Sequence, residues 1–372
     1  RSNAHTLAEL VAINNAIDGT ITLNDYSVAL SGSAADIKAA LAGTFDSTYT
    51  GNVTITDGNS TNIAATDIST IDGDTNGTIT ISNNVDINGT AAEIAAAVAL
   101  VDTFSGTPTA ELSNAHTLAE LKAINNAISG TIALNNYAVN LSGSSSDVAA
   151  ALNGNFASTY TGDVSLSDNH TLAELKTINN GTTGQLTLNS YSVALSGATA
   201  DIKQALAGTL ASTYTGNVTL SDANGTAIAA TDITTIDGDT NGTITVSNNI
   251  NMTGSAAEIT AAVAVMDTIL GAPTATLNTA HTLAQLKSVN NAFSGTIALT
   301  DYTVALSGSS SDVAAALDGT LAAQYTGNVT LSDAHTLAQL KTINSQTSGT
   351  ITLADYSVAL SGTSADVSAA LD

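Results

Sequence analysis

The stretch Tyr-Ser-Val-Ala-Leu-Ser-Gly at residues 26–32, followed by Ser-Ala-Ala-Asp-Ile at residues 33–37, decides the fold. Its apolar residues predict a short β-strand, and the serine and aspartate behind it predict the first turn of a helix. The same signature recurs along the whole chain. Thirteen copies begin with the apolar residues Val28, Val53, Val85, Ala110, Val139, Val164, Val193, Val218, Ile250, Ala275, Val304, Val329 and Val358.

These copies follow one another at intervals of 25 to 32 residues, in a register kept over the whole chain. A coil of about 27 residues cannot bury its own apolar side chains, so neighbouring coils must cover them. The sequence therefore predicts the α/β class: a right-handed parallel α/β-solenoid, β-helix-like, of about 13 coils, each a short helix plus one or two strands. Thirteen strands stacked at roughly 4.8 Å would span on the order of 60 Å. The rival fold is a string of separate small αββαβ domains. The strand–helix signature occurs in both halves of each such unit, which argues against separate domains.

A hexapeptide, His-Thr-Leu-Ala-(Glu or Gln)-Leu, marks the common repeat unit at His5, His116, His170, His281 and His335. Two diverged units fill the longer gaps. We expect residues 1–372 to form a single continuous solenoid fragment of units 5–58, 59–115, 116–169, 170–223, 224–280, 281–334 and, in part, 335–372. Neither end carries an atypical capping repeat, so we expect a fragment of a longer array.

Within the first unit, the sequence predicts two helices and three strands. Capping boxes at Thr6/Glu9 and Ser33/Asp36 should begin the helices, and strands are expected at residues 20–23, 26–31 and 52–56. The middle strand residue is Asp86 or Glu111 in some copies, so that side should face water. Equivalent capping boxes are Thr90/Glu93, Thr117/Glu120, Ser144/Asp147, Thr171/Glu174, Ser255/Glu258, Thr282/Gln285, Ser309/Asp312, Thr336/Gln339 and Thr363/Asp366.

The composition is acidic and poor in aromatic residues. Seven Lys and Arg stand against 32 Asp and Glu, a formal net charge of -25 at pH 7. Such a chain repels nucleic acids and anionic lipids and attracts cations, so we expect no nucleic-acid partner. The sequence has no cysteine, which excludes disulfides and thiolate metal sites. It has no apolar run of about 18 residues, so we expect no membrane insertion.

The sharpest candidate for a ligand site is Asp-Gly-Asp-Thr-Asn-Gly-Thr-Ile at residues 72–79, repeated at residues 237–244. It resembles the first two-thirds of an EF-hand or dockerin calcium loop, in which alternate oxygen-bearing side chains surround one ion. The twelfth position departs from that pattern, because Asn83 or Asn248 replaces the bidentate glutamate. Other units cross the same junction without carboxylates, so a plain turn is the alternative to Ca²⁺. The candidate calcium ligands are Asp72, Asp74, Asn76, Asp237, Asp239 and Asn241.

The five histidines occupy one repeated position, directly before a helix. Ile63 and Ile228 take that position in the diverged units, so we interpret the histidines as packing residues and not as bases or metal ligands. The nine tyrosines form two repeated series. A glycan-stacking surface is one interpretation of them, and a ladder inside the solenoid is the interpretation that we favour.

No motif for catalysis stands out. There is no Ser-His-Asp order, no HExxH helix and no glycine-rich phosphate loop. An enzyme of the β-helix polysaccharide-lyase kind needs a base beside an acidic cluster, and no Lys or Arg lies near the aspartate-rich segments in sequence. Outward Thr-x-Thr pairs such as Thr78/Thr80 suggest an ice-binding array, but Ala133 and Ala298 break the pattern and solvated β-propensity explains it. We therefore expect no enzymatic activity.

Three phrases resemble tandem repeats of giant bacterial surface and secreted adhesin-like proteins, cyanobacterial examples included. They are His-Thr-Leu-Ala-Glu-Leu-Lys-Thr-Ile-Asn-Asn at residues 170–180, the stretch at residues 26–32, and Tyr-Thr-Gly-Asn-Val-Thr-Leu-Ser-Asp at residues 214–222. The resemblance covers the whole chain and implies an extracellular or cell-surface location. The G-G-x-G-x-D phrase of calcium-binding nonapeptide repeats is absent.

Two functions follow as hypotheses. The first is a non-catalytic stalk or spacer in a giant bacterial surface or secreted protein, with calcium as a candidate stiffener and the neighbouring repeats of the parent protein as partners. The alternative is an adhesin-type module that recognises a glycan, a surface or a cell partner through a repeated solenoid face. A cluster of non-repeated exposed residues would favour the alternative, and none stands out in the sequence.

Overall fold

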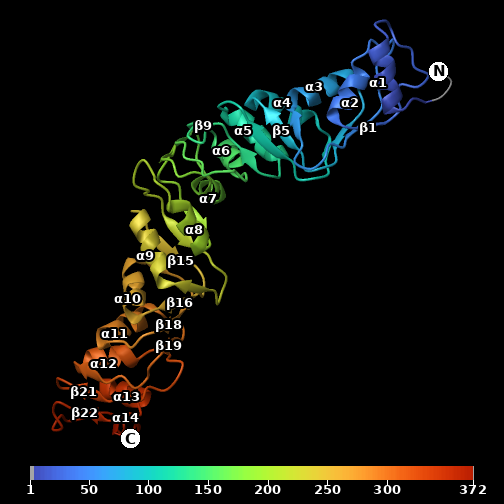
Figure 1. Cartoon of the computed structure of the whole chain (residues 1–372). Coiled ribbons are helices and arrows are strands. Elements are labelled where there is room, and N and C mark those ends of the chain that lie inside the picture. Colours follow the sequence, from blue (N-terminus) through green and yellow to red (C-terminus); the bar gives the residue numbers. More distant parts are fainter. Residues whose placement is uncertain (1–3, 372) are drawn as a thin grey trace. The chain divides into compact units, whose positions relative to one another are not determined.

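The computed structural model describes residues 4–371, where fourteen helices alternate with short parallel strands (Figure 1). Each helix begins 26 to 31 residues after the previous one, so the expected coils are present as repeated helix–strand units. Contacts divide the chain into two compact units. The first runs to Ser190 and includes Gly208–Ala211, and the second comprises Tyr191–Ala207 and the chain from Ser212 onward.

The first unit contains seven helices and three parallel sheets. The helices are Leu7–Ala16 (α1), Ala34–Leu41 (α2), Ala65–Asp74 (α3), Ala91–Leu100 (α4), Leu118–Ala127 (α5), Ser145–Leu152 (α6) and Leu172–Gly181 (α7). The strands are Leu30–Gly32 (β1), Val53–Ile55 (β2), Asn62–Ala64 (β3), Ile79–Ile81 (β4), Asp86–Gly89 (β5), Thr103–Phe104 (β6), Thr109–Leu112 (β7), Ile132–Ala133 (β8), Leu141–Gly143 (β9), Val164–Leu166 (β10) and Leu186–Thr187 (β11). The sheet orders are β1-β2-β4-β6, β3-β5-β7-β8 and β9-β10-β11.

The second unit repeats this arrangement. Its helices are Thr199–Leu206 (α8), Ala230–Asp239 (α9), Ala256–Val265 (α10), Leu283–Ala292 (α11), Ser310–Leu317 (α12), Leu337–Gln346 (α13) and Ser364–Leu371 (α14). Its strands are Leu195–Gly197 (β12), Val218–Leu220 (β13), Ala227–Ala229 (β14), Ile244–Val246 (β15), Asn251–Gly254 (β16), Thr268–Ile269 (β17), Thr274–Leu277 (β18), Ile297–Leu299 (β19), Leu306–Gly308 (β20), Val329–Leu331 (β21) and Ile351–Thr352 (β22). The parallel sheets are β12-β13-β15-β17, β14-β16-β18-β19 and β20-β21-β22. Across residues 4–371, no helix is long and apolar enough to cross a membrane.

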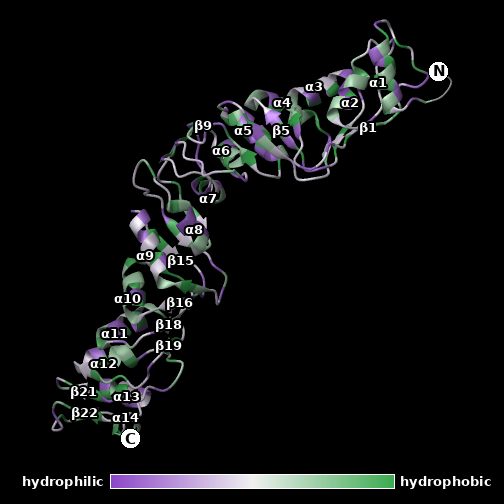
Figure 2. Ribbon diagram, viewed as in Figure 1, coloured by the Kyte–Doolittle hydropathy of each residue, from purple (hydrophilic) through white to green (hydrophobic). Residues whose placement is uncertain are grey.

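Within each unit, every helix packs on the helices before and after it, and the helices cover the strands of their own coils. Figure 2 shows that hydrophobic and hydrophilic residues interchange along these elements. Ile68 and Ile94 on helices, and Ile55 and Ile81 on strands, are fully buried. The expectation that Glu111 faces water is confirmed. The core is thus shared between successive coils, as a repeat that cannot bury its own apolar face requires.

The predicted capping boxes with Glu or Gln are present, whereas those with aspartate form only the half in which the cap hydroxyl accepts an amide. In α4, for example, the Thr90 hydroxyl accepts the amide of Glu93 and the Glu93 carboxylate accepts the amide of Thr90, at 3.2 and 2.8 Å. Serine caps such as Ser144 accept the amide of the aspartate three residues on, here Asp147. Each box satisfies amides that have no partner inside the helix, which fixes where the helix begins.

The strand expected at residues 26–31 is shorter than predicted and begins at Leu30. The preceding residues form a turn, in which the Asp25 carboxylate accepts the Ser27 amide and the Tyr26 carbonyl accepts two amides, from Thr50 and Gly51. The carbonyl of Val28 accepts the Tyr49 hydroxyl at 2.6 Å. These backbone groups are therefore bonded outside the strand ladder, and only Leu30–Gly32 remains free to pair with β2.

Polar side chains tie each helix to the next. Lys122 pairs with Asp147, and the amide of Asn125 donates to the Ala150 carbonyl at 2.6 Å. The same two ties recur at Lys287–Asp312 and from Asn290 to Ala315. The ion pairs are partly exposed, so each adds little stability, about 0–1 kcal/mol.

Candidate functional site

The first half of each candidate calcium segment is helical. Asp72, Gly73 and Asp74 form the last turn of α3, and Asp237, Gly238 and Asp239 form the last turn of α9. The segment is therefore not an open loop up to this point, in contrast to the calcium-loop pattern that it resembles. Residues two positions apart on a helix do not face each other, so the two carboxylates of each pair do not converge on one ion.

The second half of the segment is a turn held by a buried threonine. The Thr75 hydroxyl donates to the Gly51 carbonyl and accepts the Gly77 amide, both at 3.0 Å. The amide of Asn76 donates to the Tyr49 carbonyl at 2.9 Å. The turn is thus bonded to the preceding coil by protein groups alone, and Asn76 contributes through its backbone.

Thr240 makes the same bonds in the second diverged unit. The Thr-x-Gly turn also occurs in common units, where no carboxylate precedes it: Thr182 and Thr347 make the same bonds there. The recurrence of the threonine and glycine therefore has a structural explanation. The signal in the sequence is the shared threonine two residues before glycine, as in Thr182 and Gly184 and in Thr347 and Gly349.

Burial raises the pKa of the Asp74 and Asp239 carboxyl groups above their usual range. Among residues 4–371, no three acidic or histidine side chains gather into a group that could hold a metal. These two observations give calcium no preformed set of ligands at Asp72, Asp74 and Asn76 or at their second copies. Calcium binding there stays a prediction, which the experiments below address.

The five histidines are buried, and three of them, His5, His116 and His281, are hydrogen-bonded to tyrosines of the following coil. His116 Nε2 lies 3.0 Å from the Tyr160 hydroxyl, which donates to the Val139 carbonyl at 2.6 Å. Because the tyrosine proton goes to the carbonyl, the histidine must donate from Nε2, which leaves Nδ1 as an acceptor. Nδ1 of His116 has no hydrogen-bond partner. We call this chain of hydrogen bonds from histidine through the tyrosine hydroxyl to a carbonyl the relay. It also joins His5, Tyr49 and Val28, and His281, Tyr325 and Val304.

Burial sets the charge state of this relay. It lowers the pKa of His5, His116 and His281, so these rings are neutral at physiological pH. It raises the pKa of Tyr49 to about 12. The histidines are buried, as a packing position requires, and the relay adds a hydrogen bond that the sequence did not predict.

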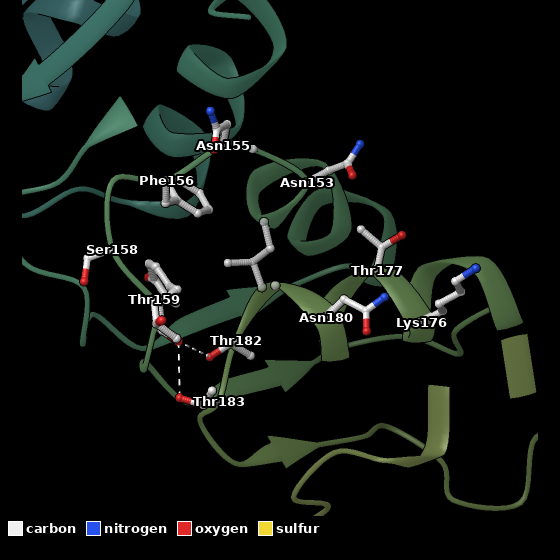
Figure 3. A pocket seen from close by; sticks show the side chains of 14 residues that line it. Asn153, Asn155, Phe156, Ser158, Thr159, Lys176, Thr177, Asn180, Thr182 and Thr183 are labelled. Atoms are coloured by element: carbon white, nitrogen blue, oxygen red, sulfur yellow. Dashed lines mark hydrogen bonds between the residues drawn. The ribbon is translucent and has the colours of Figure 1, made fainter. Parts of the chain in front are cut away.

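A hollow of 610 Å³ lies between the end of α6 and α7, within the first unit (Figure 3). Leu152, Phe156 and Tyr160 give it an apolar floor. Figure 3 shows Asn155 and Phe156 on one side of the hollow, with Thr177 and Asn180 of α7 on the other. Exposed amides therefore surround a floor that carries an aromatic ring.

A smaller hollow of 360 Å³ occupies the equivalent place beside Phe45 and Tyr49. Its lining includes Asp46 and Asp74, where the larger hollow has Ala157 and Gly181 in sequence. Gly181 lets α7 lie close to Leu152, because a Cβ there would lie 2.7 Å from Cβ of Leu152. The larger hollow is lined by no carboxylate.

Compared with models of known protein families and with curated proteins, the chain matches none of them.

Proposed function

We propose that this chain is a non-catalytic stalk or spacer segment of a larger bacterial surface or secreted protein, built as a right-handed parallel α/β-solenoid. The observation that carries the proposal is the recurrence of the same bonds between successive coils in both units. The Thr-x-Gly turn, the asparagine-to-carbonyl bond and the lysine–aspartate pair each return at equivalent positions. Repeats that contact only their neighbours extend in one direction, which suits a spacer.

The use of charged residues supports the same function. Five lysines pair with an aspartate on the next helix: Lys38, Lys122, Lys203, Lys287 and Lys341. Many acidic groups cap helices, as Glu93 and Glu258 do. The remaining excess of negative charge keeps such a segment soluble and repels like-charged surfaces. An extracellular or cell-surface location, and calcium as a stiffener, belong to this proposal and rest on the resemblance of the repeats.

Single-molecule stretching between the two ends tests the spacer function. We expect force peaks as coils detach, each releasing about 27 residues, or on the order of 90 Å of chain. The pull is repeated with chelator and with calcium, and higher peaks in calcium would support the stiffening. A chain that extends with no more resistance than an unfolded polypeptide could not act as a load-bearing spacer, and the proposal would be abandoned.

The alternative, an adhesin-type binding module, receives support from one observation, the hollow between α6 and α7. Asn153, Asn155 and Gly181 in its lining depart from the repeat, which is the feature that we expected of a binding site.

A further inference from the structure

The larger hollow is where this copy of the repeat departs from the others. Position 153 is asparagine here, and alanine or aspartate in the equivalent residues Ala42, Ala207 and Asp318. Position 155 is asparagine, whereas Thr44, Thr209 and Thr320 share one residue type. Position 181 is glycine, whereas Asp74, Asp239 and Gln346 carry side chains. In a repeat protein the shared residues build the scaffold, so departures gathered at one place indicate a specific use.

These departures change the lining of the hollow. Glycine at 181 lets α7 lie against Leu152, where a Cβ would be too close. Position 157 is alanine, as in Ala211 and Ala322, and so lacks the carboxylate that Asp46 supplies in the smaller hollow. Asn153 and Asn155 place two exposed amides at the rim. Compared with the smaller hollow, the larger one therefore has no carboxylate in its lining and has more side chains that both donate and accept hydrogen bonds.

The floor of the hollow is held in place before any ligand arrives. The Tyr160 hydroxyl is bonded to Val139 and His116, and Thr182 donates to the Gly162 carbonyl at 2.8 Å. Thr182 and Thr183 both reach the Tyr160 carbonyl, as the dashed lines in Figure 3 show. A preformed hollow of this volume falls in the range of small-molecule sites and needs little reordering on binding.

The chemistry of the lining selects the class of ligand. A chain with a net charge of -25 repels anions, and a lining without carboxylates offers nothing to a cation. Lys176 is the charged side chain in the lining, and its ammonium group adds a hydrogen-bond donor. Amide side chains bond hydroxyl groups as donors and acceptors, while a half-buried phenylalanine packs against C–H groups. A sugar ring presents both kinds of group. We infer that the hollow between α6 and α7 binds a neutral saccharide, with Asn153, Asn155 and Asn180 bonding its hydroxyls and Phe156 packing on its ring.

The inference goes beyond the spacer function and is tested apart from it. The side-chain amide signals of Asn153, Asn155 and Asn180 are followed by NMR during titration with methyl glycosides of glucose, galactose, mannose and N-acetylglucosamine. We expect saturable shifts at these amides with at least one glycoside. Glycerol, a polyol without a ring, is the control ligand and should leave them unchanged.

The test variant is Asn153→Ala with Asn155→Thr, which installs residues already present at these positions in other copies and so preserves the fold. Loss of two hydrogen-bonding amides should weaken binding about tenfold or more. The matched control is Asp318→Ala at the equivalent position of the second unit, which should leave the titration unchanged. The inference would be overturned by any of three results: the absence of a saturable shift with every glycoside of the panel, an equal response to glycerol, or an unchanged affinity in the double variant.

Discussion

Replacing Gly73 and Gly238 by alanine separates the helical structure of the aspartate-rich segments from a calcium loop. A Cβ at either glycine has no atom within 4 Å, and both residues lie inside the last turn of a helix. Alanine is favoured over glycine in helices by about 0.5–1 kcal/mol, because glycine loses more backbone freedom on folding. We therefore expect each substitution to stabilise its own coil by up to about 1 kcal/mol.

Hydrogen exchange of the α3 and α9 amides is the suitable assay, because a repeat array need not unfold in one step. A gain of 1 kcal/mol slows exchange through local opening about fivefold. The matched control is Gly184→Ala, where a Cβ would overlap the carbonyl oxygen of Gly162. That backbone atom cannot move aside without shifting its strand, so we expect faster exchange around β11.

The same variants are then melted with chelator and with millimolar calcium. The sharp turn of a calcium loop needs glycine at its sixth position, which is Gly77 or Gly242, so alanine at Gly73 or Gly238 would leave any rise in melting temperature with calcium in place. Faster exchange in Gly73→Ala, together with a calcium-dependent rise in melting temperature in both chains, would refute the helical reasoning and restore the calcium loop. Slower exchange with no calcium effect in either chain would leave Asp72 and Asp237 as residues of plain helix ends.

Three further outcomes are expected. Tyr160→Phe removes the hydroxyl between His116 and Val139 and leaves both buried groups unsatisfied, so the free energy of unfolding in urea should fall by about 2–4 kcal/mol. In the control Tyr356→Phe the ring is exposed, and the free energy of unfolding should change by less than about 0.5 kcal/mol. Equal effects of the two substitutions would contradict the relay. Acidification should weaken the fold below about pH 6.5, because burial lowers the pKa of His5, His116 and His281 and the unfolded chain binds protons at these rings first. Each ring contributes up to about 1.4 kcal/mol per pH unit, opposed by nearby carboxylates that raise its pKa: Asp25 and Glu9 for His5, Glu120 for His116 and Asp301 for His281. A stability that stays flat from pH 7 to 5 would argue against neutral buried rings. Lys287→Met should lower the stability in thermal melts by less than about 1 kcal/mol, because the ion pair with Asp312 is partly exposed. High salt screens the pair, so the difference between the variant and the parent chain should disappear there. A loss of several kcal/mol would show that the pair is a major stabiliser.

Much of the local structure was determined by the sequence itself. The capping boxes fixed the helix starts, because a hydroxyl and a carboxylate three residues apart satisfy amides that only a helix leaves open. The period of the strand motif predicted repeated helix–strand units, because a coil of this length needs a neighbour to cover its apolar side. Replacement of histidine by Ile63 and Ile228 indicated a buried position, and the structure places the histidines there.

Other features depended on contacts between coils, which no single copy of the repeat contains. The start of β1 at Leu30 follows from Tyr26 and Val28 bonding residues of the next coil. The helical course of Asp72–Asp74 follows from Thr75, whose hydroxyl reaches back to Gly51. The hollow beside Leu152 is lined from two successive coils, because Asn153 and Phe156 follow α6 whereas Thr177 and Asn180 lie on α7. Local propensity acts over a few residues, whereas these outcomes were decided by groups 20 or more residues apart that only the packed coils bring together.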